Sequence, residues 1–294
     1  MSFSKVAIIT PVKNEINFLP KLLENILNQS LVPCFWLIID DNSDDGSSEL
    51  ILDYASKYGF IYTFKNDSSK RDMLVHYSTL IEKGINYLRY KEIDYDFFGI
   101  LDADILLSKG YYQRIVEKFN KKSNLGITSG SILVPGISGF VREGIKNRSD
   151  SPRGGNRVFR KECLNQINFR SEISSNGLSL ARARMCGWHT SFNPEIISVQ
   201  RRKTSTVGGA SINYKMIARR LHYVDTPFLQ VLARFIRYVY TVNFFSAVMM
   251  IFYFINFYII EAPQCDNKKL IKYMRVDNYN IFKKEVFSRI FNRS

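Results

Sequence analysis

Cysteine is scarce in this chain of 294 residues, which contains only Cys34, Cys163, Cys186 and Cys265. These four lie far apart, and no two of them form a CxxC pair or the spacing of a zinc site. A chain of this length can build a stable core without a disulfide framework. We therefore expect reduced thiols that mostly fill the core. This excludes the small disulfide-rich and zinc-ribbon classes of protein.

A secretory signal is also lacking. The apolar run at residues 6–9 is too short for the apolar centre of a signal peptide, and it leads directly into Pro11. We therefore expect the catalytic part of the protein to stay in the cytoplasm.

Acidic residues are outnumbered, with 27 Asp and Glu against 41 Lys and Arg, for a formal net charge of +14. Such an excess favours anionic partners, which include nucleic acid, acidic lipid headgroups and phosphorylated substrates. No nucleic-acid recognition motif is present, and the basic residues concentrate near an apolar C-terminal segment. We therefore expect a membrane surface as a partner and no nucleic acid.

Short apolar runs alternate with segments of helical period in the first half of the chain. This alternation predicts an α/β fold with a mainly parallel central sheet flanked by helices. Ligands of such sheets bind at the carboxyl ends of the strands. The composition changes near residue 205, which predicts an α/β domain over 1–205 and a basic, apolar helical region over 206–294. The predicted strands are 6–10, 35–39, 60–64 and 97–101, and the predicted helices are 19–27, 47–58 and 73–90.

Asp102 and Asp104 directly follow the strand predicted at 97–101 and form a DxD motif. Two carboxylates at a strand end can meet a hard divalent cation, and oxygen ligands select Mg²⁺ or Mn²⁺. Such a cation would hold a diphosphate and neutralise charge on a leaving nucleoside diphosphate. The alternative is an acidic pair in a solvated loop.

A second acidic cluster, Asp40 and Asp41, follows the strand at 35–39. A carboxylate at this position can accept hydrogen bonds from a nucleobase or from ribose hydroxyls. The alternative is a turn and a helix N-cap, for which Asp44, Asp45 and Ser47 are suited. Asp41 is the better ligand candidate of the pair.

Pro11 and Glu15 leave the first strand. Pro11 is placed to pack on a base and Glu15 to bind a nucleoside, unless residues 14–17 only cap the next helix.

Three segments carry a resemblance to a known family: 8–15 (IITPVKNE), 37–47 (LIIDDNSDDGS) and 101–104 (LDAD). Together and in this order they resemble the family 2 glycosyltransferases. The resemblance implies a nucleotide-diphospho-sugar transferase fold and an inverting transfer from a nucleoside-diphosphate sugar, expected to be UDP-linked, to an acceptor hydroxyl. It also implies that the first two segments hold the nucleoside and that the DxD motif holds the metal and the diphosphate.

One departure from the family concerns the general base. An inverting transferase needs a carboxylate that takes the proton of the acceptor hydroxyl. The family usually supplies it just before the helix that 181–190 resembles, but residues 174–180 contain no acid and Asn176 cannot act as a base. Glu172 is the nearest candidate, with a surface charge as the alternative. A catalytically degenerate protein that binds nucleotide sugar or scaffolds a membrane assembly therefore stays open.

Basic and histidine side chains are the remaining candidate site residues. Arg201, Arg202 and Lys203 follow a strand expected at 196–199, and guanidinium groups suit a diphosphate. We take Arg202 as a substrate-binding candidate, with a solvated basic patch as the alternative. His76 has no acidic or cysteine neighbour at metal spacing, so no role is assigned to it.

The segment 238–260 contains no charged residue, and a helix of its 23 residues is long enough to span a bilayer. Basic residues stand on both sides, so the positive-inside rule gives no orientation. This pattern favours a helix or hairpin in the cytoplasmic interface, drawn to anionic lipid, while a true span and a buried helix or oligomer contact stay open. We expect a protein at the cytoplasmic face of the cell membrane, peripheral or partly embedded, with a glycan or lipid-linked acceptor.

Overall fold

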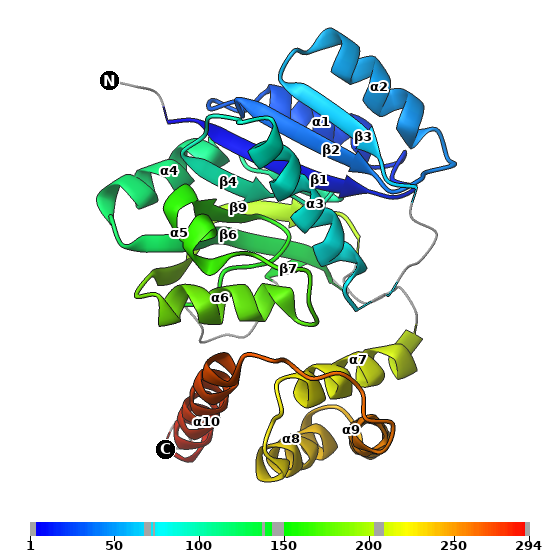
Figure 1. The fold of residues 1–294 in the computed structure, drawn as a ribbon, viewed down its shortest axis with the longest axis vertical. Coiled ribbons are helices and arrows are strands. Elements are labelled where there is room, and N and C mark those ends of the chain that lie inside the picture. Colours follow the sequence, from blue (N-terminus) through cyan, green and yellow to red (C-terminus); the bar gives the residue numbers. More distant parts are fainter. Residues whose placement is uncertain are drawn as a thin grey trace. The chain divides into compact units, whose positions relative to one another are not determined.

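The chain divides into two compact units, Met1–Thr204 and Ser205–Ser294, which are described separately (Figure 1). Lys203 and Thr204 lie outside the described residues. The computed structural model describes residues 4–67, 72, 74–136, 139–142, 150–202 and 209–291, except the side chains of 209–213, 278 and 281–291.

The strands of the first unit form one mixed sheet. They are β1 (Val6–Val12), β2 (Phe35–Asp40), β3 (Ile61–Lys65), β4 (Phe97–Ile100), β5 (Ile105–Leu107), β6 (Leu125–Gly136), β7 (Gly139–Arg142), β8 (Arg157–Arg160) and β9 (His189–Gln200). Their order is β3-β2-β1-β4-β8-β6-β9-β5, and β7 pairs with β6. The expected strands β1 to β4 pair in parallel.

The second half of the sheet corrects the prediction of a mainly parallel sheet. β8 runs antiparallel to both β4 and β6, and β5 runs antiparallel to β9. A parallel pair needs a long crossover, usually a helix, between its strands. The described residues between β6 and β8 contain no helix, and the two strands are antiparallel.

Helices cover both faces of the sheet (Figure 1). They are α1 (Leu19–Leu27), α2 (Ser47–Lys57), α3 (His76–Tyr90), α4 (Tyr111–Lys121), α5 (Lys161–Ile167) and α6 (Ser175–Met185). One core contains side chains of α1, α2 and α4, and the other contains side chains of α3, α5 and α6. Along β2, Trp36 and Ile38 enter the first core, whereas Phe35, Leu37 and Ile39 enter the second, because successive side chains point to opposite faces.

The second unit is helical. Its helices are α7 (Gly209–Tyr223), α8 (Phe228–Thr241), α9 (Phe244–Ile259) and α10 (Lys268–Phe291). The uncharged segment is not one continuous helix, because α8 ends before Asn243, whose side chain caps α9 by accepting a hydrogen bond from Ser246 N at 2.8 Å. In the described part of the chain, no helix combines the length and the apolar character needed to cross a membrane.

Candidate active site

The loops after β1, β2 and β4 open onto one cleft of about 310 Å³ at the carboxyl ends of these parallel strands. Strand pairing brings the three segments together, because parallel neighbours end at the same edge of a sheet. His76, Tyr77 and Gln200, which the sequence did not single out, also line this cleft. The predicted site residues that line it are Pro11, Glu15, Asp41, Asp102, Asp104 and Arg202.

The loops after β1 and β2 are joined by their own side chains. Asn14 lies in the left-handed region, with a φ of 53°, which asparagine tolerates better than most residues. Its backbone N–H donates to Ser43 Oγ at 3.0 Å, and its amide exchanges two hydrogen bonds with Asp44, at 2.7 and 3.0 Å. Glu15 N donates to Ser47 Oγ at 2.9 Å. These contacts hold the backbone of Glu15 at the rim of the cleft.

The two adjacent acids after β2 have different positions. Asp40 Oδ1 accepts a hydrogen bond from Ser43 N at 3.0 Å, and Asp40 Oδ2 accepts one from the hydroxyl of Ser48. Asp40 therefore stabilises the turn and the start of α2, and the described lining of the cleft does not include it. Asp41 points to the other side of the chain and lines the cleft. Of the two predicted substrate-binding acids, the structure therefore brings Asp41 to the cleft and not Asp40.

Asp41 is held by two side chains from distant segments. Its Oδ1 accepts a hydrogen bond from Asn66 Nδ2 at 2.7 Å, and His76 Nε2 lies 2.8 Å from its Oδ2. Lys83 Nζ donates to Asn66 Oδ1 at 2.5 Å, which orients the amide. His76 is the first residue of α3 and lies 35 positions from its acidic partner. Because sequence spacing reports only local neighbours, it could not reveal this pair.

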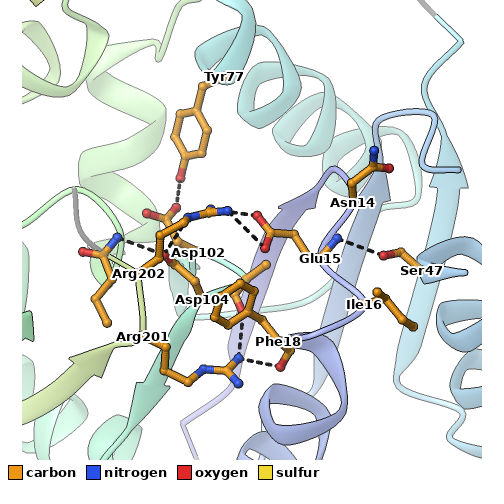
Figure 2. A network of polar contacts seen from close by, with 12 residues as sticks. Asn14, Glu15, Ile16, Phe18, Ser47, Tyr77, Asp102, Asp104, Arg201 and Arg202 are labelled. Atoms are coloured by element: carbon orange, nitrogen blue, oxygen red, sulfur yellow. Dashed lines mark hydrogen bonds and ion pairs between the residues drawn. The ribbon is translucent and has the colours of Figure 1, made fainter. Parts of the chain in front are cut away.

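Asp102 lies between a tyrosine and a glycine. Its carboxylate accepts a hydrogen bond from the hydroxyl of Tyr77, as Figure 2 shows. Its backbone N–H donates to Gly155 O at 2.9 Å. A Cβ atom on Gly155 would collide with the Asp102 carboxylate and with Ile105. Glycine at position 155 therefore allows the backbone to approach the carboxylate this closely without displacing Asp102.

Arg202 connects two acids across the cleft (Figure 2). Its Nη2 lies 2.8 Å from Glu15 Oε1, and its Nε lies 3.5 Å from Asp104 Oδ2. Gln200 Nε2 also donates to Asp104 Oδ2, at 3.1 Å. Burial raises the pKa of Glu15 above its usual value, and the neighbouring guanidinium opposes this rise. Carboxylates from the ends of β1 and β4 thus share the guanidinium group of Arg202, which follows β9.

The residues considered for the acceptor side, Glu172 and Asn176, are not among the described residues that line the cleft. Glu172 forms an ion pair with Arg182 of α6, and the described lining of the cleft does not include it. Asn176 lies in the first turn of α6, where its side chain packs on Gly154. Its backbone oxygen accepts a hydrogen bond from Arg157 Nη1 at 2.8 Å. The structure therefore does not bring Glu172 into the cleft.

Two carboxylates of the cleft fit a divalent cation. The described residues contain no group of three His, Cys, Asp or Glu side chains that could enclose a metal. Mg²⁺, however, is commonly held by one or two carboxylates, with substrate phosphates and water as the remaining ligands. Asp102 and Asp104 both line the cleft and are the carboxylates that could hold such a cation, for which Asp104 would give up its contact with Arg202.

Comparison with known proteins identifies a family to which the sequence is similar. The model described as glycosyl transferase family 2 matches residues 7–204, which is more than half of the chain. A segment of 129 residues is 26% identical to the 4,4'-diaponeurosporenoate glycosyltransferase of Staphylococcus haemolyticus (strain JCSC1435). This match covers 42% of the chain and 31% of that protein, so it spans less than a third of the relative.

Two solved structures share the fold. The mannosyltransferase PcManGT from Pyrobaculum calidifontis, in complex with GDP-Man and Mn²⁺, has a TM-score of 0.57 and 12% identity, over 100% of this chain and 89% of that one. GalNAc-T7 with UDP, GalNAc and Mn²⁺ has a TM-score of 0.62 and 14% identity, over 98% and 57%. At such identities the likeness concerns the fold alone. The family model spans residues 7–204 of the unit that carries the cleft, and the chain therefore belongs to glycosyl transferase family 2.

Proposed function

We propose that the chain transfers a sugar from a nucleoside-diphosphate sugar to an acceptor hydroxyl, with inversion at the anomeric carbon. The observation that carries this proposal is the convergence of Glu15, Asp41, Asp102 and Asp104, from three strand ends, on one cleft. Family membership supports the reaction class. The acceptor is a glycan or a lipid-linked sugar in the synthesis of a cell-surface polysaccharide or glycolipid.

The nucleoside would bind at the β1 and β2 side of the cleft. Asp41 is oriented by Asn66 and His76, and its carboxylate is suited to accept hydrogen bonds from ribose or base. Pro11 lines the same cleft and offers an apolar surface to the base. We propose a UDP-linked donor, and comparison with GDP tests that choice.

The diphosphate would bind at the β4 side. Asp102 and Asp104 would hold Mg²⁺ or Mn²⁺, which when bound neutralises the charge of the leaving diphosphate. Arg202 would add a guanidinium group, whose planar donors suit phosphate oxygens. Its present contacts with Glu15 and Asp104 keep this side chain at the cleft.

In the transfer step, the acceptor oxygen forms a bond to the anomeric carbon as the bond between that carbon and the diphosphate oxygen breaks. The hydroxyl proton must pass to a base. Glu172 can take this role only if its ion pair with Arg182 opens and the acceptor side rearranges.

A second candidate function follows from the residue at position 176. Asn176 stands where the family usually carries its acid, and an amide does not take a proton at neutral pH. The alternative is a transferase-like protein that binds nucleotide sugar without turnover, or that scaffolds a membrane assembly.

The test combines binding with turnover. Calorimetry of UDP and of GDP, each with Mn²⁺ and with EDTA, should show nucleotide binding that EDTA weakens. Release of nucleoside diphosphate from a panel of UDP-linked and GDP-linked sugars, with membrane-extracted glycolipids as acceptors, then separates the two candidates. Metal-dependent release supports the transferase. Binding without release supports the degenerate protein that binds nucleotide sugar. Absence of binding contradicts the transferase and this nucleotide-binding protein, and leaves the scaffold.

A further inference from the structure

The second unit has an apolar helix with two different faces. α9 contains 16 residues, none of them charged. One face, which includes Met250, Phe254 and Phe257, is buried in the core of this unit. The opposite face repeats every three to four residues and is exposed to solvent, as it would be in an amphipathic helix whose outer face had lost its polar residues. This exposed face consists of Phe245, Val248, Phe252, Ile255 and Ile259, which are 39–73% exposed.

α8 has the same arrangement with a third, polar face. Val231 is fully buried, and Phe235 and Tyr238 pack against the same core. Helical spacing places Arg234 and Arg237 on another side of the helix. A third stripe is apolar and exposed, namely Leu229, Leu232, Ile236 and Tyr240, which are 37–84% exposed.

The connection between the two helices joins these stripes. Every residue from 240 to 245 is exposed, and four of the six are Tyr240, Val242, Phe244 and Phe245. The ring centroids of Phe235 and Phe244 lie 6.4 Å apart, so the middle of α8 packs on the start of α9. We name the two exposed stripes and this connection the α8–α9 apolar face. Monomeric soluble proteins rarely expose a contiguous apolar patch of this kind without a binding role.

Charge indicates what covers this face. Residues 205–294 contain 13 Lys and Arg against five Asp and Glu, a net charge of +8. Lys268, Lys269 and Lys272, at the start of α10, are exposed. A second copy of the chain would bring equal positive charges together, which costs free energy. An anionic bilayer offers both an apolar layer and negative headgroups.

We propose that the α8–α9 apolar face docks on an anionic lipid bilayer. Phe245, Phe252 and Ile259 enter the boundary between headgroups and acyl chains, while the basic side chains of α8 and α10 contact the headgroups. The docking holds the transferase unit close to a membrane-bound acceptor. It does not depend on sugar transfer, so it is tested without turnover.

Vesicle flotation of the full chain tests this surface. Phosphatidylcholine vesicles containing phosphatidylglycerol should carry the protein, and phosphatidylcholine alone should carry much less. Phe252→Glu and Phe245→Glu should each weaken binding about tenfold or more, because an aromatic side chain that docking would bury in the bilayer is replaced by a charge. Leu52→Glu, at an exposed apolar residue of α2, is the matched control and should bind like the wild type. Added salt should weaken binding through the screened headgroup attraction.

Three outcomes would overturn the proposal. The first is equal flotation of the wild type and both phenylalanine variants, or no flotation at all. The second is a wild-type dimer in light scattering that Phe252→Glu dissociates, which would assign the face to a second copy. The third is a lower melting temperature for Phe252→Glu with unchanged flotation, which would mean that the face packs inside the protein. Calorimetry of UDP with Mn²⁺ on the same variants reports on the transferase unit separately.

Discussion

The donor side and the acceptor side of the cleft differ in how completely they carry the chemistry of the family. On the donor side, Asp41, Asp102 and Asp104 line one space, and each contacts a neutral or basic side chain that orients it. On the acceptor side, the position expected to hold an acid holds Asn176, and Glu172 is paired with Arg182. Under the proposed function, donor binding and acceptor activation therefore depend on different residues, and mutations can test each one alone.

The largest effect is expected at Asp104. Asp104→Asn removes one of two carboxylates proposed to hold the cation and weakens the contact with Arg202. We expect release of nucleoside diphosphate to fall about 100-fold or more, since cation stabilisation of the leaving group amounts to several kcal/mol. Asp53→Asn, at an exposed acid of α2, is the control and should keep wild-type activity. Equal activity of both variants would show that Asp104 has no role in the transfer.

Gly155→Ala tests the support of the donor side. The added methyl group collides with the Asp102 carboxylate and must displace it. We expect Mn²⁺-dependent UDP binding to weaken about tenfold, since displaced supporting contacts typically cost 10–100-fold in metal affinity. Gly59→Ala is the matched control, because a Cβ there meets no atom within 4 Å. Calorimetry compares the two, and an unchanged affinity in Gly155→Ala would show that the position of Asp102 does not matter for the cation.

Asn176→Asp tests the acceptor side directly. If this side lacks only a base, the new carboxylate should raise turnover about tenfold, which is less than the ~100-fold or more of an optimally placed general base, and leave UDP affinity unchanged. Asn86→Asp, on an exposed position of α3, introduces the same charge as a control. No gain in turnover, together with a loss in Glu172→Gln, would instead assign the base to Glu172 and make the two sides of the cleft equally complete.

The smallest effect is expected at His76. His76→Gln weakens the contact that orients Asp41 but leaves the carboxylate in place. One hydrogen bond contributes about 1 kcal/mol, so the Kd for UDP should rise about fivefold with little change in turnover. His189→Gln, at an exposed residue of β9, is the control. A large loss of turnover without a change in Kd would move His76 from donor binding to the transfer step.

The residues explain which parts of the fold were predictable. Val6–Val12 and Phe35–Asp40 are buried along nearly their whole length, so their apolar runs stand out in the sequence. The second half is harder, because β6 contains Gly, Thr and Ser and β9 alternates buried and exposed positions irregularly. β8 has only four residues, so local periodicity carries no signal for the direction in which it pairs with β4 and β6.

The amino-acid sequence alone determined which strand ends carry acids, because apolar runs and the residues that follow them are local properties. It therefore predicted Asp41 as a ligand of the nucleoside, and Asp102 and Asp104 as ligands of the metal. Only the tertiary structure decided that Asp40 turns away, that His76 and Tyr77 contact the two acids, and that Glu172 is paired elsewhere. These contacts join residues from separate elements, and the packing of helices on the sheet, rather than sequence spacing, sets the distances between them.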